Sequence, residues 1–212
     1  MWIKPEYPKK RVGKAGEYLI GRRENKESLD ESIMILNNWR SAHAFPLNSI
    51  QNSLRHRAKK VDKNYLITQR LKRISSIENK LKRFPEMKLN RMQDIGGCRV
   101  ILSNNSMVYS LKNDILKTQS FEMVREYDYL QSPKESGYRG IHLIFKYCGK
   151  CKDFKGLKIE IQIRSKIQHY WATAVEIVGT FTNQQLKAGF GNEEWLVFFK
   201  LVSELLDDFE ND

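Results

Sequence analysis

Three short segments combine acidic residues with arginine in patterns that could bind a phosphorylated ligand: residues 94–99, 134–142 and 158–164. The third segment alternates without a break, and a period of two is typical of a strand with one buried face. The buried face would carry Ile159, Ile161 and Ile163, and the other face Lys158, Glu160, Gln162 and Arg164. Such a polar face is ordinarily only solvated. Because all three segments share this mixture, we expect the fold to bring them together around a nucleoside triphosphate.

Two carboxylates in these segments, Asp94 and Glu160, suit Mg²⁺, a hard ion that usually takes one or two carboxylates from the protein and its other ligands from water and phosphate. Phosphoryl transfer depends mostly on positioning and on charge stabilisation. The sequence contains no G-x-x-x-x-G-K-[ST] loop, so side-chain cations would have to hold the phosphates. Each cation taken singly is more typical of a solvated surface. The candidates are Arg70, Lys72, Lys80, Arg99, Arg139 and Arg164.

Composition limits the class of protein more than its fold. The chain has 212 residues, 41% of them hydrophobic, and a formal net charge of +12, which favours a polyanionic partner. No apolar run reaches membrane-spanning length and no signal-peptide core is present, so we expect a cytoplasmic protein without membrane contact. The three cysteines argue against a disulfide framework. The Cys148–Cys151 C-x-x-C pair is interpreted as a plain turn, with metal binding and redox regulation as the alternatives.

Hydrophobic periodicity predicts an α/β or α+β domain with a mixed sheet. A capping box from Ser28 to Glu31 would begin the second helix, with Ile33, Leu36 and Trp39 facing inward, and Pro46 would interrupt the helical region. The expected strands are 65–71, 97–102, 121–127, 140–147 and 157–164, the last two forming a hairpin. The expected helices are 12–23, 28–42, 47–60, 75–83, 106–117, 166–178 and 193–209, with a short piece near residue 184.

These elements divide the chain into three parts. Residues 1–62 form a basic arm followed by helices, residues 63–180 form the core with the candidate site, and residues 181–212 form a helical, acidic extension. The acidic extension would either shield the basic surface or, as is usual for a run of charge, simply be solvated.

Four segments resemble, in order and spacing, the synthetase domain of the RelA/SpoT family: 69–81, 94–99, 134–142 and 160–164. The resemblance implies a nucleotidyltransferase-like mixed sheet of about five strands flanked by helices. It also implies an ATP-dependent, Mg²⁺-requiring transfer of the β,γ-diphosphate of ATP to a ribose 3′-hydroxyl, with release of AMP.

The resemblance also implies roles for individual residues. Arg70 and Arg99 would sandwich adenine, while Lys72, Ser76 and Lys80 would contact the ATP phosphates. Asp94 and Glu160 would hold Mg²⁺, and Glu160 would help to deprotonate the attacking hydroxyl. Tyr138 would be an exposed aromatic platform for the acceptor base. The further acceptor-side contacts would be Arg139, His142, Gln162 and Arg164.

One position departs from the family pattern, because Glu176 stands where many members have a histidine in a helix near the acceptor. This departure and the +12 charge favour the subgroup of toxic small synthetases, which modify the 3′-terminal adenosine of tRNA in toxin–antitoxin and phage-defence systems. None of the four histidines precedes an aspartate, so the hydrolase motif of bifunctional members is missing. The activity would then be restrained by an antitoxin protein or a fused antitoxin domain, by another missing domain or by regulation.

Two alternatives stay open: a GDP/GTP pyrophosphokinase that makes ppGpp and pppGpp, and a catalytically inactive RNA-binding module. Contacts to tRNA would come from exposed cations, each of which alone is more typical of a solvated surface. These are Lys9, Lys10, Arg11, Arg55, Arg57, Lys59, Lys60, Lys82 and Arg83.

Overall fold

Five segments rich in β-branched and aromatic residues form one mixed sheet in a computed structural model, which describes residues 2–22 and 29–211. The strand order is β1-β2-β5-β4-β3, with β2 and β5 parallel and the other neighbours antiparallel. The strands are β1 (Leu66–Leu71), β2 (Gly96–Leu102), β3 (Phe121–Asp128), β4 (Ile141–Tyr147) and β5 (Lys158–Ser165). The predicted mixed sheet and the 140–147/157–164 hairpin are confirmed.

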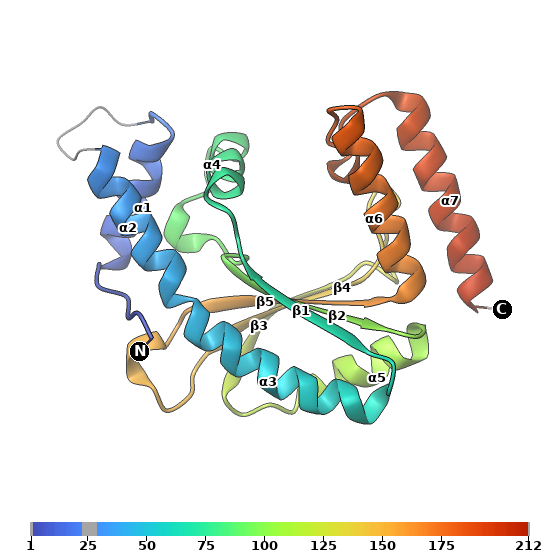
Figure 1. The fold of residues 1–212 in the computed structure, drawn as a ribbon, viewed down its shortest axis with the longest axis horizontal. Coiled ribbons are helices and arrows are strands. Elements are labelled where there is room, and N and C mark those ends of the chain that lie inside the picture. The colour runs from blue at the N-terminus through green and yellow to red at the C-terminus, as the bar shows by residue number, and fades with distance from the viewer. Residues whose placement is uncertain (1, 23–28, 212) are drawn as a thin grey trace.

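The central strand β5 carries the alternation seen in the sequence. Ile159, Ile161 and Ile163 are all fully buried in the main core. The helices α3 and α5 lie under this face of the sheet and pack on β1, β2 and β5 (Figure 1). The opposite face of β5, which carries the polar residues, is therefore free to line a site.

Two groups of helices rise on either side of this opposite face (Figure 1). One group contains α1, α2 and α4, and the other contains α6 and α7. The helices are α1 (Lys9–Leu19), α2 (Leu29–Ala42), α3 (Ala44–Val61), α4 (Ile74–Arg83), α5 (Asn105–Ile115), α6 (Lys166–Phe181) and α7 (Glu193–Asn211). Three short 3₁₀ turns complete the elements: η1 (Leu89–Arg91), η2 (Lys152–Phe154) and η3 (Leu186–Ala188).

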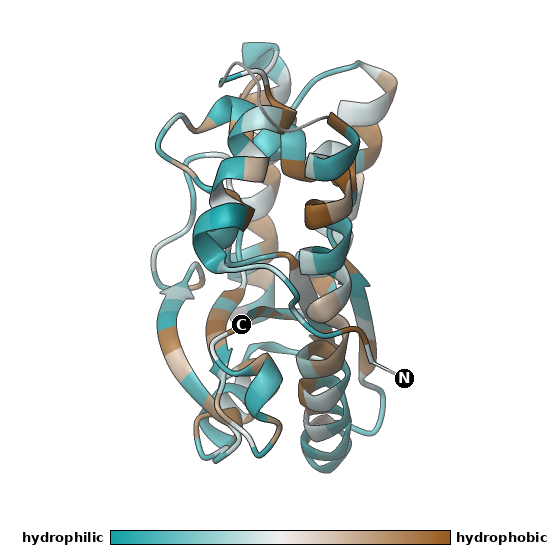
Figure 2. Cartoon of the chain, turned by 90° about the vertical axis from the view of Figure 1, so that its left-hand side faces the viewer, coloured by the Kyte–Doolittle hydropathy of each residue, from teal (hydrophilic) through white to brown (hydrophobic). Residues whose placement is uncertain are grey.

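Hydrophobic residues form two separate clusters. The main cluster joins the first group of helices to α3, α5 and the core face of the sheet. On the side nearest α1 and α2, hydrophobic and hydrophilic residues alternate around the helices, as amphipathic packing requires (Figure 2). The second cluster includes Tyr138, Trp171 and Phe199, and the Trp171 indole donates to the Phe199 carbonyl at 2.8 Å. This small cluster fixes α7 against α6.

Several local predictions need correction. Pro46 does not interrupt a helix: it lies in the first turn of α3, where its missing N–H would have had no intrahelical partner. The proposed cap at Ser28 lies outside the described residues. In α2, Leu36 and Trp39 are buried as expected, whereas Ile33 is only half-buried and Ile35 takes the inward position.

Cys148 and Cys151 follow β4 as exposed, free thiols. Among the described residues, no group of three or more His, Cys, Asp or Glu side chains could hold a metal ion. No helix within residues 2–22 and 29–211 is long and apolar enough to cross a membrane.

Candidate active site

The register of the sheet arranges the candidate residues in two rows across its open face. Residues that are directly paired on neighbouring strands point to the same face. The first row contains Arg70, Gly97, Glu160 and Ile144. The second row contains Thr68, Arg99, Gln162, His142 and Tyr127. Segments far apart in the sequence thus meet on one surface.

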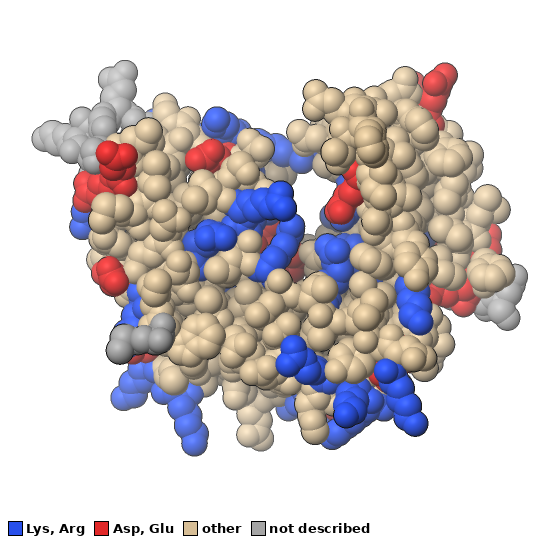
Figure 3. All heavy atoms as spheres, viewed as in Figure 1, with Lys and Arg blue, Asp and Glu red and all other residues tan. Residues whose placement is uncertain are grey.

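Both rows line a cleft of about 750 Å³ between the two groups of helices. Lys and Arg side chains gather in this hollow around acidic ones (Figure 3). Of the predicted site residues, the cleft brings together Arg70, Lys80, Asp94, Arg99, His142, Glu160 and Gln162. Lys72 and Ser76 line an adjoining hollow that shares Lys80 and Asp94 with the cleft.

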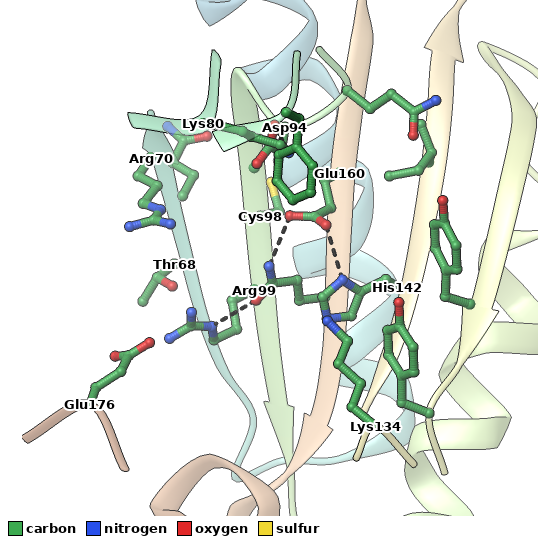
Figure 4. Close-up of a pocket in the computed structure, with 18 residues that line it drawn as sticks. Thr68, Arg70, Lys80, Asp94, Cys98, Arg99, Lys134, His142, Glu160 and Glu176 are labelled. Atoms are coloured by element: carbon green, nitrogen blue, oxygen red, sulfur yellow. Dashed lines mark hydrogen bonds and ion pairs between the residues drawn. The ribbon is translucent and has the colours of Figure 1, made fainter. Parts of the chain in front are cut away.

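Arg70 and Arg99 stand at the β1–β2 end of the cleft (Figure 4). Thr68 is directly paired with Arg99, so Arg70 is the diagonal neighbour of Arg99 on the same face. The Cα atoms of diagonal neighbours are about 7–8 Å apart. Atoms in contact are about 3.5–4 Å apart, so this spacing leaves room for one flat ring between two guanidinium planes. The predicted adenine sandwich is compatible with this spacing.

Asp94 is held by two lysines. Lys72 Nζ donates to one carboxylate oxygen and Lys80 Nζ to the other, each at 2.9 Å, and all three side chains are largely shielded from solvent. Lys80 comes from α4 and Lys72 from the residue after β1, so the carboxylate ties the two elements together. A phosphate group in this place would compete with Asp94 for both ammonium groups.

Glu160 stands near the middle of the cleft and accepts hydrogen bonds from His142 Nδ1 at 3.0 Å and Gln162 Nε2 at 2.8 Å (Figure 4). Burial alone would raise the pKa of Glu160. The hydrogen bonds from His142 and from the Gln162 amide, together with the nearby Lys80, outweigh burial and lower the pKa of Glu160 below its ordinary value. Glu160 is therefore an ionised acceptor at neutral pH.

Tyr138 does not lie where the sequence places it. Its side chain is only 2% exposed, so the expectation of an exposed platform is wrong in this structure. Gly137 adopts φ +83°, and a Cβ there would lie 3.1 Å from the Lys200 backbone. The loop is pinned further by Ser203 Oγ, which donates to the Gly137 carbonyl at 2.5 Å. Docking of α7 thus turns the Tyr138 ring inward.

The buried Tyr138 hydroxyl connects two other candidate residues. Arg164 Nε donates to the hydroxyl at 2.9 Å, and the hydroxyl lies 2.6 Å from His142 Nε2. The Glu160 carboxylate can only accept, so His142 Nδ1 must be the protonated nitrogen of the neutral ring and Nε2 must accept from Tyr138. Burial lowers the pKa of His142, consistent with a neutral imidazole. The result is a continuous hydrogen-bond chain from Arg164 to Glu160.

Arg139 is a second correction to the acceptor set. Its guanidinium lies outside the cleft and pairs with Asp207 of α7 at 3.0 Å. It also donates to Ser203 Oγ at 3.3 Å. Arg139 therefore fixes α7, and Arg164 acts from behind the cleft because it is buried and donates to Gln162 Oε1 at 2.9 Å.

Several cleft residues are not among the site residues predicted from the sequence. Lys134 Nζ lies 4.6 Å from the Tyr129 ring centroid and 5.1 Å from that of Tyr138, at the same end of the cleft as His142 (Figure 4). Lys134 lies in a segment that the sequence singled out, so its basic side chain was available as a signal. Tyr127 and Tyr129 also line the cleft, and no local pattern distinguishes them from ordinary strand aromatics.

Glu176 lies at the other end of the cleft, close to Thr68 and Arg99 rather than His142 and Lys134 (Figure 4). Its carboxylate pairs with Lys187. Glu176 therefore shares this end of the cleft with the two arginines of the predicted adenine sandwich.

The candidate RNA contacts fall into three areas, and the first is the start of α1, which carries Lys9, Lys10 and Arg11. Arg55, Lys59 and Lys60 are exposed on α3, on the opposite side of the sheet from the cleft (Figures 1 and 3). On the same helix, Arg57 pairs with Asp114 at 2.7 Å, which gives it a structural partner. On α4, Lys82 and Arg83 line the hollow next to the cleft.

Residues 69–182 match the family model described as the region found in RelA/SpoT proteins. The chain belongs to the RelA/SpoT family. Two curated relatives from Bacillus subtilis (strain 168) are similar in sequence. GTP pyrophosphokinase YjbM is 34% identical over 110 residues, covering 50% of this chain and 52% of the relative. GTP pyrophosphokinase YwaC is 36% identical over 111 residues, covering 49% and 52%. Each match thus spans about half the length of the relative.

Solved structures of family members share the fold. Small alarmone synthetase 2 from Bacillus subtilis superposes with a TM-score of 0.68 at 23% identity, over 87% of this chain and 95% of that one. Small alarmone synthetase 1 from the same organism, bound to its product pppGpp, gives a TM-score of 0.58 at 27% identity, over 69% and 74%. The fold expected from the resemblance is confirmed.

Proposed function

We propose that this RelA/SpoT-family chain is a pyrophosphokinase that transfers the β,γ-diphosphate of ATP to the ribose 3′-hydroxyl of GDP or GTP. The observation that carries the proposal is the position of Glu160 in the cleft: an ionised carboxylate between two ends that both offer cations and flat groups. One end has Arg70 and Arg99. The other has Lys134 with Tyr129, whose ring also contacts His142, and Tyr127, which is paired with His142 in the sheet. A two-substrate transfer needs such a division.

The donor would occupy the end formed by β1, β2 and α4. Its base would lie between Arg70 and Arg99, and its phosphates would extend toward Lys72, Ser76 and Lys80. Lys72 and Lys80, which are bonded to Asp94 in this structure, would exchange the carboxylate for phosphate oxygens. The positive charges of the two lysines would then be balanced both before and after the donor binds.

Asp94 and Glu160 fit a Mg²⁺ ion, because both offer hard oxygen ligands in one cleft and this ion takes its remaining ligands from phosphate and water. When bound, Mg²⁺ would neutralise the charge that develops on the phosphate oxygens. Asp94 becomes available as a ligand once the donor phosphates engage Lys72 and Lys80.

The acceptor would occupy the end with His142, Gln162 and Lys134. Glu160 would accept a hydrogen bond from the 3′-hydroxyl and take its proton as that oxygen bonds to the β-phosphorus. The bond between the β-phosphorus and the bridging oxygen breaks, and AMP leaves with that oxygen. The hydrogen-bond chain from Arg164 through Tyr138 and His142 would keep Glu160 aimed at the acceptor.

A guanine nucleotide is favoured as acceptor because both curated relatives are named GTP pyrophosphokinases. The tRNA interpretation, with its toxin and antitoxin, relied on Glu176 and on net charge. Glu176 lies beside Arg99, and its partner Lys187 lies 5.6 Å from the Tyr138 ring centroid, so the position of Glu176 does not argue against a guanine nucleotide as acceptor. The comparisons give the tRNA interpretation no support, and tRNA is retained as an arm of the test.

The test offers ATP labelled at the γ-phosphate with GDP, GTP, intact tRNA or tRNA that lacks its terminal adenosine. We expect label on GDP or GTP with equal release of AMP. Glu160→Gln should abolish transfer, whereas Glu122→Gln, which changes an exposed glutamate paired with Lys146, should not. Label on intact tRNA alone would overturn the acceptor assignment, and the absence of both label and AMP would favour an inactive module.

A further inference from the structure

Glu176 is a cleft residue whose carboxylate has no role in the transfer described above. It projects from α6 and points toward Arg99 and Thr68, at the end of the cleft proposed for the donor base (Figure 4). Among the residues that share this end, Arg70 and Arg99 are cations with hydrogen-bond donors only. Glu176 therefore supplies a hydrogen-bond acceptor at the edge of the proposed base site.

A second residue fixes the Glu176 carboxylate. Lys187, in the 3₁₀ turn η3, donates to Oε1 of Glu176. The turn is itself connected to the 134–142 loop, because Ser136 Oγ lies 3.4 Å from the Lys187 carbonyl and donates to it. The Glu176 side chain is 53% exposed, and its ion pair with Lys187 favours one direction of the carboxylate.

The charge state of Glu176 is also defined. Burial would raise its pKa, but the hydrogen bond and charge of Lys187, with Arg99 and Arg164 nearby, lower it. The carboxylate is therefore ionised at neutral pH and can accept hydrogen bonds but cannot donate them.

We propose that Glu176 is the residue that selects the base of the diphosphate donor. It would accept a hydrogen bond from an exocyclic amine on the base between Arg70 and Arg99, and it would repel a base that presents a carbonyl oxygen there. This selects adenine over hypoxanthine or guanine. The inference rests on the proposed function only for the position of the donor base.

Stacking between two arginines cannot provide this selection, because every base offers a flat face to a cation. Edge contacts must distinguish one base from another, and Glu176 is an ionised acceptor that lies beside Arg99 in the cleft that Arg70 also lines. A hydrogen bond to a charged group makes a difference of about tenfold to a hundredfold in affinity.

The experiment measures the affinity of the full chain for α,β-methylene ATP and for its hypoxanthine counterpart by calorimetry, with Mg²⁺ and without acceptor. The wild type should prefer adenine by about tenfold to a hundredfold. In Glu176→Gln the amide can donate to a carbonyl, so the preference should fall to about threefold or less. Glu194→Gln, at the exposed start of α7, is the matched control and should retain the preference.

An unchanged preference in Glu176→Gln would overturn the inference, as would a wild type that binds both analogues equally. If the wild type discriminates and Glu176→Gln does not, but no acceptor is ever labelled, the inference stands and the proposed transfer fails. If the wild type binds neither analogue, the donor site is wrong and both fall.

Discussion

Replacing Tyr138 with phenylalanine tests the largest difference between sequence and structure. Phenylalanine keeps the ring, which packs in the Trp171–Phe199 cluster and lies 4.8 Å from the Arg164 guanidinium carbon. It removes the hydroxyl that accepts from Arg164 Nε and donates to His142 Nε2. If the ring were an exposed platform for a base, the hydroxyl would be solvated and its loss would barely affect folding.

The size of the effect follows from the buried position of Arg164. Its side chain is 1% exposed and Nη1 already has no hydrogen-bond partner among the described residues, so removal of the Tyr138 hydroxyl would leave only Nη2 bonded, to Gln162. An unpaired buried donor costs about 1–3 kcal/mol, with charged groups at the upper end. We therefore expect Tyr138→Phe to lower the free energy of unfolding by about 2–3 kcal/mol, or the melting temperature by about 4–12 °C.

Equilibrium unfolding in guanidinium chloride would measure this change. Tyr170→Phe is the matched control, because the Tyr170 side chain is 65% exposed and its substitution should alter stability by less than about 0.5 kcal/mol. Tyr138→Ala should cost more, about 3–5 kcal/mol, since it also opens a cavity. Equal unfolding midpoints for Tyr138→Phe, Tyr170→Phe and the wild type would refute the buried network and return Tyr138 to the surface.

Two further predictions concern titration and metal binding. Burial lowers the pKa of His43 to about 4, so the folded state resists protonation of this side chain. The free energy of unfolding should therefore fall as pH decreases from about 6.5 to 4, by up to about 3 kcal/mol. His43→Asn should flatten this slope in unfolding measured across that range, and an unchanged slope would contradict a buried, neutral His43. Asp94→Asn should leave binding of α,β-methylene ATP without Mg²⁺ intact or tighter, because Lys72 and Lys80 are released. The same substitution should remove the gain in affinity that Mg²⁺ brings, which calorimetry with and without the ion would measure. If the gain persists in Asp94→Asn, Asp94 is not a ligand of the ion.

Much of the sheet was predictable because its signals are local. The alternation in 158–164 specifies which face of β5 is buried, and the two faces of a strand cannot exchange without moving every isoleucine to solvent. Pairing of β5 with β2 and β4 then brings Arg99 and His142 to the same face as Gln162. The error at Pro46 was also local: a proline is tolerated in the first turn of a helix, and the sequence alone did not show where that turn begins.

The positions of Tyr138 and Arg139 were not predictable, because they depend on a helix about 60 residues further along the chain. Ser203 and Asp207 of α7 hold the 134–142 loop, and nothing in the S-G-Y-R-G segment indicates that such a partner exists. A glycine-flanked aromatic is as compatible with a buried ring as with an exposed one. Only the second hydrophobic cluster decides between them.

Glu176 illustrates why a departure from a family pattern is ambiguous until its place in the fold is known. In the sequence, a glutamate in place of histidine counted against a guanine nucleotide as acceptor. In the structure the same residue faces Arg99 rather than His142, so its first effect should be on what binds beside Arg99. Under the proposed function, residues around Lys134 and Gln162 would distinguish the acceptor, and Glu176 would distinguish the donor. Substitutions at the two ends should therefore alter acceptor and donor preference independently.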